Sequence, residues 1–177
     1  FGYVDILNQR ASYPSAKRAA ETLCIAYEQE FGLNTVIVRP GHIYGPSITA
    51  ADSRASAQFT RNAAKGEDII MKSEGTQLRS YCYTLDCASA ILTVLLNGVS
   101  GNAYNISNAA SIVSISEIAQ ALAEAAGKKV VFGQATENEK RGYNQMQNSS
   151  LNAEKLEMLG WSAVFSLEKG SRKTVFF

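Results

Sequence analysis

The sequence has few of the residues that build metal sites and disulfide frameworks. It contains one histidine and three cysteines, and the cysteines form no C-x-x-C pair. A zinc set needs more ligands than this, so no metal site is expected. An odd number of thiols favours reduced cysteines in a cytoplasmic protein, with at least two of Cys24, Cys82 and Cys87 partly buried.

An excess of charge and a long apolar run are missing as well. Seventeen basic residues stand against sixteen acidic ones, the net charge is +1, and no basic block stands out. Non-specific nucleic-acid binding is therefore not predicted. The apolar run 88–96 is too short to span a membrane, and no signal peptide is recognised, so no membrane partner is expected. With 46% hydrophobic residues in 177, the chain has enough apolar material for a sizeable core.

The pattern of apolar residues and breakers predicts an α/β fold. A helix over 14–31 starts with Pro14 and stops at Gly32, and the β-branched run 35–38 follows as a strand expected to be buried on both faces. Asp86 is expected to cap the helix 86–96, and Ser114 or Ser116 to cap the helix that ends at Gly127. The remaining expected helices are 53–65 and 151–159, the remaining strands are 68–72, 80–84, 103–106 and 129–132, and 133–150 is expected to be a loop.

Tyr13 and Lys17 are four residues apart at the head of the first helix, so both lie on one face. A cation beside a phenol favours phenolate and lowers the pKa of a tyrosine. Such a tyrosine can accept a hydroxyl proton, which is the chemistry required when an alcohol carbon gives up a hydride. The alternative is ordinary packing of a tyrosine under a lysine stem.

Four separated segments resemble one family in order and spacing. Residues 12–18 (SYPSAKR) resemble the Y-x-x-x-K element of the extended short-chain dehydrogenase/reductases, the NAD-dependent epimerase/dehydratase family of nucleotide-sugar enzymes. Residues 39–46 (RPGHIYGP) resemble its R-P-x-N-x-Y-G-P loop, and residues 75–86 (GTQLRSYCYTLD) its G-x-Q-x-R-x-[YF]-x-Y-V-x-D segment. Residues 159–161 (LGW) with 166–170 (SLEKG) are similar to its closing signature.

The resemblance implies the C-terminal half of a Rossmann-type doubly wound sheet plus a small α/β substrate-binding domain. Residues 1–47 correspond to the last part of the NAD-binding domain. Residues 48–177 correspond to the nucleotide-sugar region, with some elements returning to the Rossmann sheet. Family members commonly dimerise through the tyrosine-bearing helix, so a homodimer is expected. The face of Ala19, Ala20, Leu23 and Tyr27 would serve either that contact or the parent's own sheet.

The resemblance also assigns catalytic and cofactor roles. Tyr13 would be the general base, and Lys17 would bind the nicotinamide ribose of NAD and tune the tyrosine. Pro40 would contact the nicotinamide through its carbonyl. The first step would be oxidation of a sugar hydroxyl at C4, with NAD accepting the hydride.

Four residues are candidate contacts for a UDP- or dTDP-linked sugar. Arg79 matches the family arginine on the diphosphate, with a surface ion pair as the alternative. Arg141 precedes Gly-Tyr-Asn where relatives carry a diphosphate arginine. Arg54 matches a basic position facing the phosphates, or else marks a solvated helix start. His42 stands where the family has asparagine, and is either a ligand or a structural histidine. Tyr44 and Tyr81 would stack on a ring or pack in the core.

The sequence departs from the family at the glycine-rich dinucleotide fingerprint, because no G-x-x-G-x-x-G occurs. That motif binds pyrophosphate at a helix N-terminus. The family's active-site Ser or Thr, expected upstream of the tyrosine, would also fall before Phe1. The sequence thus resembles the C-terminal half of a member, inactive alone. Residues 10–17 loosely resemble the UDP-glucuronate decarboxylase branch, which leaves lyase activity as an alternative to isomerase activity. A non-catalytic nucleotide-sugar-binding module is the third possibility.

Overall fold

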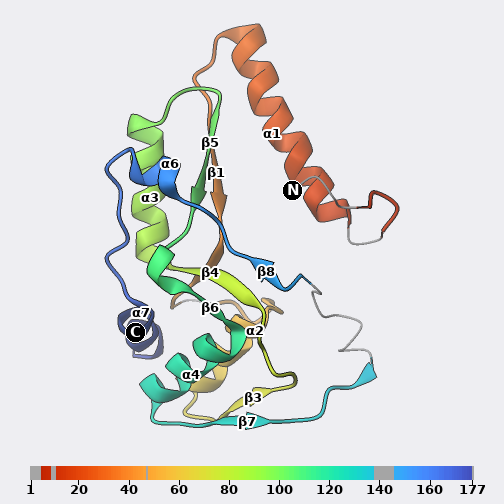
Figure 1. The fold of residues 1–177 in the computed structure, drawn as a ribbon, viewed down its shortest axis with the longest axis vertical. Coiled ribbons are helices and arrows are strands. Elements are labelled where there is room, and N and C mark those ends of the chain that lie inside the picture. The colour runs from red at the N-terminus through yellow and green to blue at the C-terminus, as the bar shows by residue number, and fades with distance from the viewer. Residues whose placement is uncertain (1–4, 9–10, 47, 138–145, 177) are drawn as a thin grey trace.

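The computed structural model describes residues 5–8, 11–46, 48–137 and 146–176 and shows an α/β fold with several parallel strand pairs (Figure 1). Within these residues no helix is long and apolar enough to cross a membrane. The helices are α1 Ser12–Phe31, α2 Ala55–Ala64, α3 Thr84–Asn97, the 3-10 turn η2 Ala109–Ser111, α4 Ile115–Ala126, α6 Glu154–Glu157 and α7 Leu167–Val175. The strands are β1 Val36–Pro40, β2 His42–Tyr44, β3 Ile69–Met71, β4 Leu78–Tyr83, β5 Asn102–Ile106, β6 Ile112–Ser114, β7 Val130–Phe132 and β8 Asn148–Ser149.

One hydrophobic cluster lies around the parallel pair β1–β5. Strand β1 runs beside β5 from Val36 opposite Asn102 to Pro40 opposite Ile106. Helix α3 packs on this pair and α6 packs on β5. The buried members of the cluster are Cys82, Cys87, Ala90, Val94, Tyr104, Ile106, Leu156 and Trp161. Strand β1 itself is only half-buried along Val36–Arg39, so the expectation of burial on both faces is wrong for the described chain.

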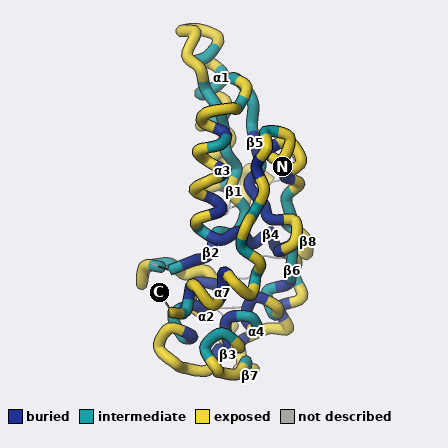
Figure 2. Tube along the Cα trace, turned by 90° about the vertical axis from the view of Figure 1, so that its left-hand side faces the viewer, coloured by how far each residue is buried: buried dark blue, intermediate teal, exposed yellow. Residues whose placement is uncertain are grey.

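A second cluster holds the other strands and helices together. Strand β4 pairs parallel with β2, antiparallel with β6 and parallel with β8, while β3 pairs parallel with β7. Helices α2, α4 and α7 pack against one another beside these strands, and Figure 2 shows buried segments where they meet. Its buried members include Phe59, Ile69, Met71, Tyr81, Ile118 and Leu122.

Helix α1 is tied to the rest of the described chain mainly by polar contacts. It ends at Gly32, which has φ 65° and is a left-handed stop suited to glycine. Arg39 donates from Nε and Nη2 to the Glu21 carboxylate at 2.8 and 2.6 Å, and Thr35 Oγ1 donates to the Cys24 carbonyl. No residue of α1 is buried, and Leu23, Tyr27 and Phe31 are exposed. The apolar side chains of Leu23, Tyr27 and Phe31 on α1 are therefore left uncovered in the described chain, although α1 contacts strand β1 elsewhere.

The expectation that Asp86 caps its helix is wrong. Helix α3 begins two residues earlier, at Thr84, and no side chain caps it. Asp86 is buried, and its carboxylate oxygens accept the backbone N–H groups of Val164 and Phe165, both at 3.0 Å. The carboxylate therefore fixes a distant segment that leads into α7.

The other boundaries differ in detail from the expectations. The capping residue of α4 is Ser114, and Glu117 completes a capping box with it. The expected loop 133–150 contains β8, and the expected helix 151–159 is reduced to the single turn α6. Strand β6 and helix α7 were not predicted.

Candidate functional site

Strand β2 leaves β1 through a tight crossing at Gly41. A Cβ at Gly41 would lie 2.8 Å from the Ser80 carbonyl oxygen and 3.3 Å from that of Ile106, so only glycine fits without a shift. The crossing sets His42 in register with Tyr81 on β4. Their rings are 5.7 Å apart between centroids. Strand β2 thus places His42 beside Tyr81 of β4.

Arg79 occupies a central position on β4, and this explains its burial. It lies opposite Val113 of β6 on one side and Ser149 of β8 on the other. Arg79 is 3% exposed, and its Nη1 donates a hydrogen bond to the Leu78 carbonyl at 2.7 Å. Burial lowers the pKa of the guanidinium, while Tyr81 opposes the shift. Among the described residues no carboxylate forms an ion pair with Arg79, which is unusual for a buried cation.

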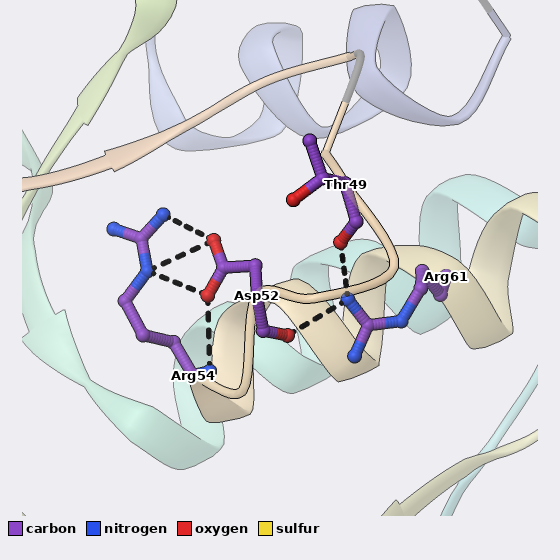
Figure 3. A network of polar contacts seen from close by, with 4 residues as sticks. All are labelled: Thr49, Asp52, Arg54 and Arg61. Atoms are coloured by element: carbon purple, nitrogen blue, oxygen red, sulfur yellow. Dashed lines mark hydrogen bonds and ion pairs between the residues drawn. The ribbon is translucent and has the colours of Figure 1, made fainter.

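Arg54 lies at the start of α2, and a nearby carboxylate holds its guanidinium (Figure 3). Arg54 Nε donates to both Asp52 oxygens at 3.0 and 3.1 Å, and Nη2 donates to Asp52 Oδ2 at 2.5 Å. Arg61 Nη1 donates to the carbonyls of Thr49 and Asp52, which fixes the segment before the helix. Hydrogen bonds from Arg54 lower the pKa of Asp52 to about 2, so the pair persists at neutral pH.

His42, Arg54 and Arg79 line one cavity of about 630 Å³. This volume is in the range of small-molecule sites. Lys72 and Gln77 line it as well, and Phe59, Met71 and Ile115 supply apolar wall. The structure therefore brings together three of the four expected substrate contacts. Arg141, the fourth, lies outside the described residues.

The electrostatics of the cavity favour an anion. Arg54, Lys72 and Arg79 carry positive charge at its wall, and Asp52 forms an ion pair with Arg54. Burial, followed by the positive charges of Arg79 and Arg54, lowers the pKa of His42 to about 4. The imidazole is therefore neutral at physiological pH. Burial likewise raises the pKa of Tyr81 to about 12, so its phenol stays protonated.

Tyr13 and Lys17 are near each other on α1 but are not part of the cavity wall. Lys17 Nζ lies 5.6 Å from the centroid of the Tyr13 ring, and both side chains are exposed. The hydrogen bond to Asp52 raises the pKa of Arg54, and the phenols of Tyr13 and Tyr81 raise it to a smaller extent. Tyr13 is thus linked electrostatically to one residue of the cavity wall, and Lys17 lies beside Tyr13.

The exposed pair has the chemistry to hold the nicotinamide end of a dinucleotide. A phenol and an ammonium one helical turn apart can both bond a ribose, and Pro40 is the exposed last residue of β1. The described residues offer these groups but no glycine-rich turn for the pyrophosphate, in keeping with the sequence. The residues present therefore fit one end of the cofactor.

Sequence reasoning missed Lys72 and Gln77, and it left Tyr44 and Tyr81 undecided. Lys72 follows β3, and Gln77 stands inside the motif at 75–86, which is the signal that marks it. Tyr81 is buried and also forms part of the cavity wall, so it packs in the core and at the same time borders the candidate ligand site. Tyr44 is core: it is 2% exposed, packs against Tyr81 and Tyr83, and its hydroxyl donates to the Leu167 carbonyl at 3.4 Å.

The cysteines are free thiols, and two of them are buried, as expected. Cys82 and Cys87 lie in the cluster around β5, and burial raises the pKa of Cys82 to about 12. A thiol of this kind is a poor nucleophile. In the described part of the chain no three His, Cys, Asp or Glu side chains are grouped to hold a metal ion.

The chain is similar to known proteins in sequence and in fold. The model of the NAD dependent epimerase/dehydratase family matches residues 3–107. The chain is 27% identical to UDP-glucuronic acid decarboxylase 1 of Xenopus tropicalis over 100% of its own length and 41% of the relative's. It is 29% identical to UDP-glucuronic acid decarboxylase 5 of Arabidopsis thaliana, covering 96% of the chain and 48% of that relative.

A solved structure of an epimerase shares the fold of this chain. UDP-glucose 4-epimerase of Thermotoga maritima, crystallised with UDP-glucose, superposes with a TM-score of 0.78 at 26% identity, over 92% of this chain and 52% of that one. The chain therefore spans about half the length of the relatives it matches.

Proposed function

Because this chain belongs to the NAD dependent epimerase/dehydratase family, we propose that its cavity binds the diphosphate of a nucleotide-sugar and that it is part of an enzyme that oxidises the sugar at C4. A UDP- or dTDP-linked sugar is the proposed substrate. Related proteins with the Rossmann-type fold have been crystallised with UDP-glucose or with NAD, which supports the substrate class and the cofactor.

The burial of Arg79 carries the proposal. A guanidinium that is 3% exposed and has no carboxylate partner among the described residues bears an uncompensated charge. Its planar fork matches phosphate oxygens, and a diphosphate would supply the missing counter-charge. Arg54 and Lys72 add positive charge to the same wall. A neutral ligand would bring no counter-charge to Arg79.

Tyr13 is the proposed base, and Lys17 binds the ribose beside it. Bound NAD supplies hydride acceptance. Tyr13 takes the proton from the sugar hydroxyl. Its phenol is exposed, and its electrostatic interaction with Arg54 of the cavity wall supports this role. Pro40, His42 and Arg141 complete the proposed contacts to cofactor and sugar. The chain alone is proposed to be inactive, since it spans about half of its relatives and lacks the pyrophosphate-binding turn.

Two further proposals concern the setting of the protein. The exposed Leu23, Tyr27 and Phe31 of α1 support a homodimer through that helix. The free cysteines support a cytoplasmic location.

A decarboxylase is the second candidate reaction. The two curated relatives described above are UDP-glucuronic acid decarboxylases, and they match nearly the whole chain. A sugar oxidised at C4 is a shared intermediate of the two reactions, so the cavity and Tyr13 serve both. Binding UDP-glucuronate more tightly than UDP-glucose would favour the decarboxylase. A non-catalytic binding module remains the alternative if the enzyme that carries this sequence, supplied with NAD, shows no turnover.

Calorimetric titration with UDP-glucose, UDP-glucuronate and dTDP-glucose tests the proposal. We expect binding of at least one of them, and strong weakening when Arg79 is replaced by Gln. Arg172→Gln is the matched control, because Arg172 pairs with Glu168 on the exposed surface of α7. Absence of binding by all three ligands, or equal weakening by both variants, would reject the proposed site.

A further inference from the structure

His42 departs from the asparagine expected in its loop, and its surroundings give the departure a consequence. It is the one histidine of the sequence, and it lines the cavity from β2. Unlike an asparagine amide, an imidazole can gain a proton and become a cation. Whether it does so depends on the charges that face it.

The groups around His42 come from every side of the cavity. Strand β4 contributes Arg79 and the phenol of Tyr81, whose ring lies 5.7 Å from the imidazole between centroids. The start of α2 contributes Arg54, whose charge Asp52 partly compensates. The segment after β3 contributes Lys72. Among the described residues, the charges of Arg79 and Arg54 act on His42, and both oppose a proton on the imidazole in the empty cavity.

We propose that His42 is a proton-coupled contact for the diphosphate: it is neutral in the empty cavity and takes up a proton when the anion binds. The inference rests on the proposed function. A diphosphate would neutralise the arginines that repel the imidazolium and would place an acceptor beside it. Asparagine at this position would bind without any proton uptake, so histidine makes nucleotide-sugar affinity depend on pH.

The direction of the dependence follows from linkage. The pKa of His42 in the free chain is lowered to about 4, first by burial and then by the two arginines. A bound anion raises that pKa, so the complex holds more protons than the free chain between the two values. Affinity therefore rises as pH falls through this window, by up to about tenfold per pH unit. The phosphates of UDP-glucose are diesters that stay ionised throughout and contribute no proton of their own.

A proton NMR titration of the imidazole reads this coupling directly. With one histidine in the sequence, the imidazole signal of the untagged chain needs no assignment. We expect a midpoint at about pH 4 without ligand, and a rise of about 1 to 3 pH units with saturating UDP-glucose. In parallel, His42→Asn should bind UDP-glucose with an affinity that does not change with pH.

Each outcome decides something different. A free midpoint at about 6.5, the ordinary histidine value, would overturn the inference. So would a midpoint that stays at about 4 while calorimetry shows UDP-glucose bound, and in that case the nucleotide-sugar site would stand. An unchanged pH dependence of binding in His42→Asn would assign the coupling to another group. Absence of binding at every pH would reject the proposed function, and this inference with it.

Discussion

Replacing Arg79 by Gln should weaken nucleotide-sugar binding without unfolding the chain. The side chain is 3% exposed, and its single described hydrogen bond runs to the Leu78 carbonyl. Loss of a charge-assisted bond to phosphate costs about 1.5 to 3 kcal/mol, which corresponds to a Kd about 10- to 150-fold higher. Loss of the bond to Leu78 costs about 1 kcal/mol of folding free energy, and removal of an uncompensated buried charge offsets it.

The two readouts together separate ligand binding from a structural role. Calorimetry with UDP-glucose gives the Kd, and urea unfolding gives the free energy of unfolding. We expect a large change in the first and a change within about 1 kcal/mol in the second. A loss of several kcal/mol in stability with unchanged Kd would refute the reasoning, because it would make Arg79 a structural cation. The surface variant Arg172→Gln should leave both values unchanged.

Four further predictions follow from the same contacts. Asp52→Asn should release Arg54 and lower the Kd for UDP-glucose about two- to fivefold by calorimetry, since a competing carboxylate is removed; a raised Kd would instead make Asp52 a positioning residue. Ser114→Ala should remove the capping box of α4 and cost about 1 kcal/mol in urea unfolding; an unchanged midpoint would contradict the role of the cap. Hydrogen bonds from Ser114 lower the pKa of Glu117 in the folded chain, so the unfolded chain binds more protons as the pH falls. The stability that Glu117 contributes is present above its unfolded pKa and is lost as the pH falls through its folded pKa. Glu117→Gln should therefore make the stability fall less steeply with pH in acid unfolding curves. Asp86→Ala should cost about 3 kcal/mol or more, because two buried N–H groups lose a charged acceptor, and wild-type stability would exclude the tie to Val164 and Phe165.

Local signals predicted the elements that depend on local chemistry. The two candidate caps, Ser114 and Ser116, placed the start of α4 to within two residues, and Gly32 and Gly127 mark the ends of α1 and α4 in the left-handed conformation. Strand β6 and the two-residue β8 were missed because neither is long enough for a periodic pattern, and both depend on pairing with β4. The predicted role of Asp86 was wrong because a carboxylate near the start of a helix suggests a cap. Its actual partners, the N–H groups of Val164 and Phe165, lie 78 and 79 residues away in the sequence.

The candidate site shows the same division between local and long-range information. Motif spacing singled out His42, Arg54 and Arg79, and the structure places all three on one cavity. The sequence around Arg79 did not predict its burial, because the strands that pair with β4 on either side of Arg79 come from distant residues around 113 and 149. Nor did it predict the pairing of Arg54 with Asp52, or the contribution of Lys72 to the wall.

A crystal structure of the chain with UDP-glucose tests the central claim most directly. The account predicts the diphosphate in the cavity between β2, β4 and the start of α2, within hydrogen-bonding distance of the Arg79 guanidinium. A diphosphate bound elsewhere, for example in the smaller cavity beside Ser107 and Glu154, with Arg79 still unpaired, would contradict it.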